Sequence, residues 1–188
     1  MSAYFESVLR EMENATDDIT DTELLTMRTS KGKWSAAETL EHLTLTFSST
    51  AKLMQKLSGS SPSVPQPTLK QRIATTIVVG LGHLPSGRKS PDFALPVTAD
   101  LIDVRARFRE ALSEMDQQIT SCERVHGTSK KVAAHPILGP LSLREWRKFH
   151  LVHTRHHLAQ IRRMRTGGSS TNGSAERGNR RVSTTKQE

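Results

Sequence analysis

The sequence predicts an all-α domain, and three observations carry this prediction. Apolar residues recur every three or four positions in several segments, and two of these segments begin with the spacing of a capping box. No segment shows the alternation of apolar and polar residues that is typical of a half-buried strand. Stretches rich in proline, serine and glycine, 58–68 and 85–98, separate the helical segments as long loops. We expect an antiparallel helical bundle with long crossover loops.

The apolar periodicity places the helices along the chain. Helices are expected over 3–15, 35–59, 69–84, from about 98 or 100 to 119, and 142–164. The second helix starts at Ser35, with Glu38 three residues later, and the last starts at Ser142, with Glu145 at the same spacing. The apolar run within 69–84 is too short to span a membrane and is expected to form a buried helix.

The chain is expected to contain one domain over residues 1–165 and a disordered basic tail over 166–188. The tail consists of glycine, serine, threonine, asparagine and charged residues, and it carries too few apolar side chains to offset the entropy of ordering it. The remaining length suffices for one hydrophobic core.

Composition limits the classes of partner and compartment. The formal charge is +8, but the basic residues are spread along the chain and aromatic residues make up only 4%, so specific nucleic-acid binding is not expected. No stretch approaches the length of a membrane span, and the first residues lack the apolar core of a signal peptide. With Cys122 as the single cysteine, no disulfide framework can form, and we expect a cytoplasmic protein.

The histidines suggest a metal site. His153 and His157 are four residues apart on the last helix, which places both imidazoles on one side of it. His42 on the second helix is the best candidate for a third ligand, and three histidines plus a water form the open arrangement of catalytic zinc sites. Imidazole ligands also suit nickel, iron or copper. Alternatively, these histidines are packing residues. His150, on the same face, is expected to face solvent; the alternatives are a fourth ligand of the metal or a proton carrier beside it.

The segments KWSAAETLEHL (33–43) and EWRKFHLVHTRHHLAQI (145–161) resemble the DinB-like (DinB/YfiT) superfamily of metalloenzymes. The fragment HPILGPLS (135–142) is similar to a branch of that superfamily whose function is unknown. The resemblance implies a four-helix bundle with up-down-down-up connectivity, frequent homodimers, and a zinc or nickel ion held by His42, His153 and His157. Members include S-transferases that use bacillithiol or mycothiol, and an isomerase that uses mycothiol.

The leading functional hypothesis is a metal-dependent enzyme, of hydrolase or thiol S-transferase type, in which the ion activates a water or a low-molecular-weight thiol toward a small-molecule substrate. Glu38 is a candidate for orienting His42 or acting as a base, although its capping role alone accounts for it. Gln160 is a candidate for hydrogen bonding a metal-bound ligand. Residues that bind a thiol cofactor cannot be mapped by the resemblance. The alternative is a non-enzymatic metal-binding or stress-response module that acts as a dimer.

Overall fold

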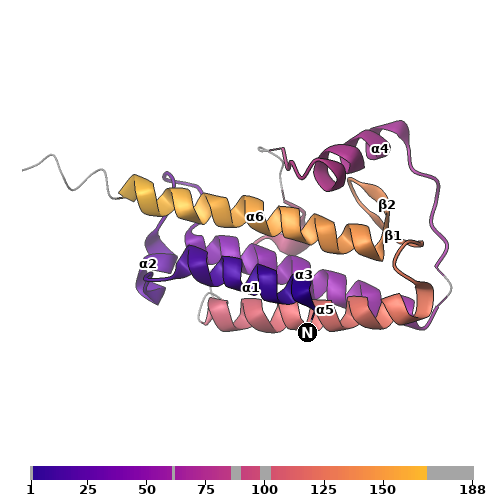
Figure 1. The fold of residues 1–188 in the computed structure, drawn as a ribbon. Helices are drawn as coiled ribbons and strands as arrows, with labels where there is room; N and C mark the ends of the chain where they lie inside the picture. Colours follow the sequence, from indigo (N-terminus) through magenta and orange to yellow (C-terminus); the bar gives the residue numbers. More distant parts are fainter. Residues whose placement is uncertain (1, 61, 86–89, 98–102, 169–188) are drawn as a thin grey trace, which may run out of the picture.

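The computed structural model describes residues 2–60, 62–85, 90–97 and 103–168, and this part of the chain is mainly helical. Four long helices lie alongside one another (Figure 1). Their bounds are α1, Ala3–Thr16; α3, Ala36–Ser58; α5, Val104–His126; and α6, Leu143–Gly168. Helix α3 packs most extensively against α5, and α1 packs against α6. The prediction of a mainly helical fold is confirmed.

Local capping explains where three of these helices begin. The Ser2 hydroxyl accepts a hydrogen bond from the Phe5 amide at the start of α1. At the start of α3, the Ser35 hydroxyl accepts from the Glu38 amide, and the Glu38 carboxylate accepts from the Ser35 amide at 2.6 Å. Ser142 and Glu145 form the same reciprocal pair before α6. These interactions satisfy backbone N–H groups that have no partner within the helix.

The hydrophobic core lies between the four long helices. Phe47 of α3 and Phe108 of α5 pack edge to face with ring centroids 5.2 Å apart, and both are fully buried. The apolar stripe predicted on the fourth helical segment is buried, including Leu112, Met115 and Ile119. Burial of these stripes supplies most of the helical stability.

Two short strands, which the sequence analysis did not predict, precede α6. Strand β1, Lys131–His135, pairs antiparallel with β2, Gly139–Ser142. All residues of β2 and two adjacent residues of β1 are buried, so the hairpin lacks the alternation that would identify it. The hairpin leads directly into the Ser142 cap.

The segment 69–84 is not the single buried helix that was expected. It forms a short helix α4, Leu69–Thr75, followed by a π-helix η1, Thr76–Gly80. Ile73 is 54% exposed and Leu81 is 76% exposed, whereas Val78 and Val79 are buried. Since η1 packs on α6 along one side, only part of the apolar run is covered.

Other element boundaries also differ from expectation. A short helix α2, Asp21–Thr26, starts with a capping box formed by Thr20 and Glu23. The start expected for the fourth helix, near residue 98 or 100, lies outside the described residues, and α5 continues to His126, where Gly127 ends it with φ +74°. Helix α6 includes 166–168, and the remainder of the predicted tail lies outside the described residues. A 3-10 turn η2, Asp92–Ala94, sits beside α3.

None of the described helices combines the length and the apolar character required to cross a bilayer.

Candidate metal centre

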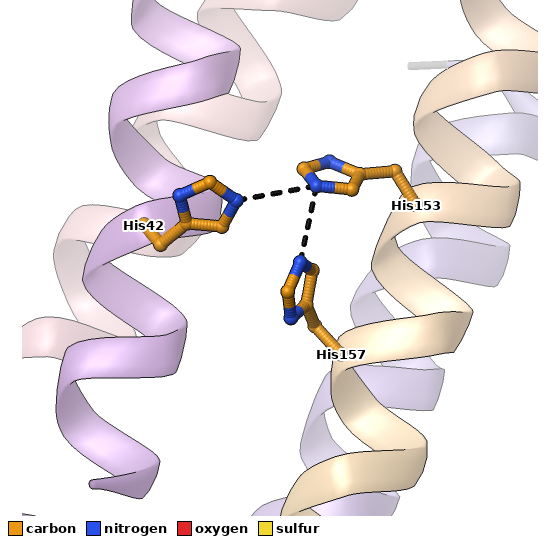
Figure 2. A group of neighbouring side chains, drawn as sticks. All are labelled: His42, His153 and His157. Carbon is orange, nitrogen blue, oxygen red and sulfur yellow. Dashed lines mark hydrogen bonds between the residues drawn. The ribbon is translucent and has the colours of Figure 1, made fainter. Parts of the chain in front are cut away.

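Three histidines from two helices meet inside the bundle. His42 projects from α3, and His153 and His157 project from α6 toward it (Figure 2). The Nε2 atom of His153 lies 3.2 Å from Nε2 of His42 and 3.1 Å from Nε2 of His157. The structure therefore brings together all three residues that the sequence identified as candidate ligands.

The spacing of these nitrogens suits a metal ion. Bonds of about 2.0–2.1 Å from a tetrahedral zinc ion would place two ligand nitrogens roughly 3.3–3.4 Å apart. The two short separations in the cluster are within a few tenths of an ångström of that value. One ligand atom from each of the three side chains lies within 4.8 Å of the other two. The cluster therefore needs little rearrangement to hold one ion.

His42 is fixed by contacts on both sides of its ring. Its Nδ1–H donates to the backbone carbonyl of Ala94 in η2 at 2.8 Å, which directs the lone pair of Nε2 toward α6. The indole of Trp34 lies against the ring, with centroids 5.0 Å apart. Hydrogen bonding of the non-ligating nitrogen is typical of metal-binding histidines. The sequence did not reveal Ala94, because any residue type can offer its carbonyl.

Gln160 orients His157 in the same manner. The Nδ1–H of His157 donates to Oε1 of Gln160 at 2.9 Å, and the amide nitrogen of Gln160 lies 3.1 Å from Nε2 of His156. The second contact fixes which end of the Gln160 amide faces His157. Gln160 thus contacts a candidate ligand within the cluster, and the spacing of three residues on a helix is the signal for this contact.

His153 carries a buried polar atom without a partner. Its Nδ1 accepts or donates no hydrogen bond within the described part of the chain, and its ring stacks on Phe149. With Nδ1 protonated in His42 and in His157, both neighbouring Nε2 atoms direct lone pairs at His153. A proton on one nitrogen of His153 cannot satisfy both neighbours and both of its own nitrogens. A cation among the three Nε2 atoms would remove the conflict between the facing lone pairs.

Burial keeps the three imidazoles neutral. Burial lowers the pKa of His42, although the hydrogen bond to the Ala94 carbonyl opposes this shift. The pKa of His153 is well below its usual range because of burial and, secondarily, the nearby His157 and His42. Burial is also the main reason why the pKa of His157 falls to about 3. Neutral imidazole is the form that binds metal, so the cluster is in its ligating form at neutral pH.

Glu38 lies one turn before His42, but its carboxylate points to the helix start. It accepts from the Ser35 amide and pairs with Arg28 at 2.5 Å. These contacts account for its position. A catalytic role for Glu38 stays a prediction.

The expectation that His150 faces solvent is wrong. His150 is 1% exposed, and its Nε2 lies 2.9 Å from the hydroxyl of Thr50 on α3. Trp146 stacks beside it with ring centroids 6.0 Å apart. The ring fills a space between α3 and α6 because Thr50 supplies a polar partner inside the core.

The comparisons with known proteins agree with this geometry. The family model of the DinB superfamily matches residues 4–161, which include all three histidines and most of the described chain. No curated protein and no solved structure gives a significant match. Because the family model covers far more than half of the sequence, the chain belongs to the DinB superfamily.

Proposed function

We propose that this protein is a metal-dependent enzyme that uses His42, His153 and His157 to hold a divalent ion, with zinc or nickel as the first candidates. The convergence of three neutral Nε2 atoms is the observation that carries the proposal. Nitrogen ligands and a cluster with no thiolate suit either metal. We include in the proposal the up-down-down-up order of the four long helices that the family resemblance implies.

When bound, such an ion would lower the pKa of a water or of a low-molecular-weight thiol and so provide a nucleophile at neutral pH. The residues around the ion would hold and orient its three ligands. The Ala94 carbonyl and Gln160 keep the protons of His42 and His157 on Nδ1, so that both rings offer Nε2. The Phe149 ring packs on His153 and limits its rotation.

Access to the cluster is expected at His157. His42 and His153 are only 3% and 8% exposed, whereas His157 is partly exposed. A small-molecule substrate would therefore approach along the His157 side of the cluster. The reaction in this proposal is either hydrolysis or transfer of the thiol sulfur to an electrophilic substrate, and the choice between them needs a direct assay.

The proposal also includes a cytoplasmic homodimer. Cys122, the single cysteine, is buried with its thiol 3.5 Å from the Met54 carbonyl, and burial raises its pKa. A buried cysteine of this kind is inert and needs no oxidising compartment. The homodimer is proposed from the family resemblance. Analytical ultracentrifugation of the chain measures its oligomeric state.

The test is turnover by protein loaded with zinc or with nickel. Each form is assayed for ester hydrolysis with p-nitrophenyl acetate, and for thiol transfer with monochlorobimane and either cysteine or bacillithiol. We expect turnover in one assay that His153→Ala abolishes, with Arg144→Gln as an exposed control on the same helix. One bound ion per chain without turnover in either assay would favour the non-enzymatic dimeric module instead.

A further inference from the structure

A second feature of α6 lies on the side of the helix that faces away from the histidine cluster. A surface pocket of about 600 Å³ is formed by this side of α6 and by residues 80–84, which follow η1. At 100° per residue, the α6 residues that line the pocket point on average roughly 140° away from the mean direction of His153 and His157. The pocket and the candidate metal centre therefore lie on different faces of α6, and they meet where the pocket-lining ring of His156 contacts the ring of His157, with centroids 5.3 Å apart.

Residues 80–84, which form one wall of the pocket, are held against α6. Nζ of Lys148 donates to the carbonyl of Gly80, the last residue of η1, at 3.3 Å. Gly82 turns the chain with φ +70°, and a Cβ atom at this position would lie 3.9 Å from a methyl group of Val152. π-helical segments such as η1 often occur at functional sites. These contacts fix the position of residues 80–84 relative to α6, and so the two walls of the pocket.

Positive charge gathers in this pocket, and only one of its three Lys and Arg side chains pairs with a carboxylate in the described part of the chain. Lys148, Arg155 and Arg163 line it together with His83 and His156, and none of its described lining residues is acidic. Arg155 is paired with Glu11 of α1. Within the described part of the chain, no carboxylate pairs with Lys148 or Arg163. Two cations at the surface of one pocket attract an anion, and phosphate or carboxylate oxygens accept their hydrogen bonds.

The rest of the lining is apolar. Leu81, Leu84 and Leu151 contribute to it, and Leu81 is 76% exposed. An exposed leucine beside a charged pocket offers a surface for the apolar part of a ligand. The volume falls within the range of about 300–1,000 Å³ that is usual for small-molecule sites.

We propose that this pocket binds a small amphiphilic anion, whose phosphate or carboxylate group contacts Lys148 and Arg163 and whose apolar part packs on Leu81. The site takes a metabolite-sized ligand rather than a polymer, because Lys148 and Arg163 line a pocket of about 600 Å³ whose neighbouring wall is apolar. A phosphate group and a carboxylate group can both accept hydrogen bonds from these cations, and the probes described below distinguish between the two.

Calorimetric titration of the full chain tests the proposal. Hexyl phosphate and hexanoate are the anionic probes, and hexanol is the neutral probe of the same chain length. We expect one anionic probe to bind and hexanol not to bind. Binding of hexanol with the same Kd as both anions, or no binding of either anion in the millimolar range, would overturn the proposal.

Variants of exposed residues locate the site. Lys148→Gln with Arg163→Gln should raise the Kd for the bound probe by about tenfold or more, since each change removes a charge-assisted hydrogen bond. The control, Arg144→Gln with Arg165→Gln, removes the same charge from exposed positions of α6 outside the pocket. An equal loss of affinity in both double variants would show general attraction of anions and contradict the site.

Leu81→Ser separates the two parts of the ligand. It should weaken hexyl phosphate or hexanoate while leaving the response to inorganic phosphate unchanged. Duplex DNA and anionic vesicles test for a larger partner. If either binds tightly in a way that requires Lys148 and Arg163, and neither six-carbon probe binds, the partner is a polymer or a membrane and the proposal is overturned.

Discussion

Two histidines on the same face of α6, less than one turn apart, have different partners on α3. Nε2 of His153 faces Nε2 of His42, a ring nitrogen that carries a lone pair. Nε2 of His150 instead faces the hydroxyl of Thr50. The Thr50 hydroxyl can donate or accept, so it satisfies Nε2 of His150 without a further group. Within the described part of the chain, Nδ1 of His150 is buried without a partner, as is Nδ1 of His153. The cluster around His153 has no such donor. The difference teaches that the residue on the facing helix, and not the histidine spacing alone, separates a candidate ligand from a packing residue.

The largest effect is expected when each histidine is removed from metal-free protein. His150→Ala should lower the free energy of unfolding by about 2–4 kcal/mol, because it leaves a cavity in the core and a hydroxyl without its partner. His153→Ala should cost less, because it also removes the ring on which the lone pairs of the His42 and His157 Nε2 atoms converge. Urea unfolding in the presence of a chelator measures both values.

Thr50→Val sharpens this comparison, since it removes the hydrogen bond of His150 and leaves the volume nearly unchanged. A cost of about 1 kcal/mol is expected. The comparison breaks down if His153→Ala destabilises the metal-free protein more than His150→Ala does.

The second prediction concerns the residue that orients His157. Gln160→Ala should weaken zinc or nickel affinity by about 10- to 100-fold, because the Nδ1 proton of His157 loses its acceptor and the ring is free to turn. Gln160→Glu keeps an acceptor at the same distance and should retain most of the affinity. Competition with a chromophoric chelator measures the affinities. An unchanged affinity in Gln160→Ala would remove Gln160 from the site.

The third prediction concerns the acid dependence of stability. Burial, and secondarily the nearby His135, lowers the pKa of His150 to about 3, below the value of about 6.5 in the unfolded chain. Between these values the unfolded state binds the proton and the folded state does not, so stability falls as the pH falls. The contribution of His150 is about 1.4 kcal/mol per pH unit.

His150→Gln should therefore reduce the slope of the unfolding free energy against pH between about pH 6 and pH 4 by roughly this amount. Urea titrations of metal-free protein at several pH values provide the measurement. Identical slopes for wild type and His150→Gln would show that His150 takes up its proton in the folded state.

The helices and the histidine cluster were predictable because their signals are local. Ser35 with Glu38 and Ser142 with Glu145 mark helix starts within a few residues, and His153 and His157 share a face by spacing alone. The assignment of His42 as the third residue also depended on the resemblance of its segment to the DinB-like superfamily.

The features that the sequence did not predict depend on distant partners. The burial of His150 requires Thr50, which lies 100 residues away in sequence. The Ala94 carbonyl that holds His42 comes from an irregular segment and carries no side-chain signal. Strand β2 is buried along its whole length, so it shows no period of two. In each case tertiary contact, and not local pattern, determines the outcome.

The most direct test of the metal centre is the metal content of the protein. The protein is purified without an affinity-tag metal, exposed to zinc or nickel, and analysed by mass spectrometry. The wild type is compared with His153→Ala and with the double variant His42→Ala, His157→Ala. His150→Gln, which alters the neighbouring histidine only, is the matched control. We predict about one ion per chain in the wild type and in His150→Gln, and none in the other two variants. A wild-type protein that holds no zinc or nickel, or an ion that persists in His153→Ala, would contradict the assignment of the three histidines as a metal site.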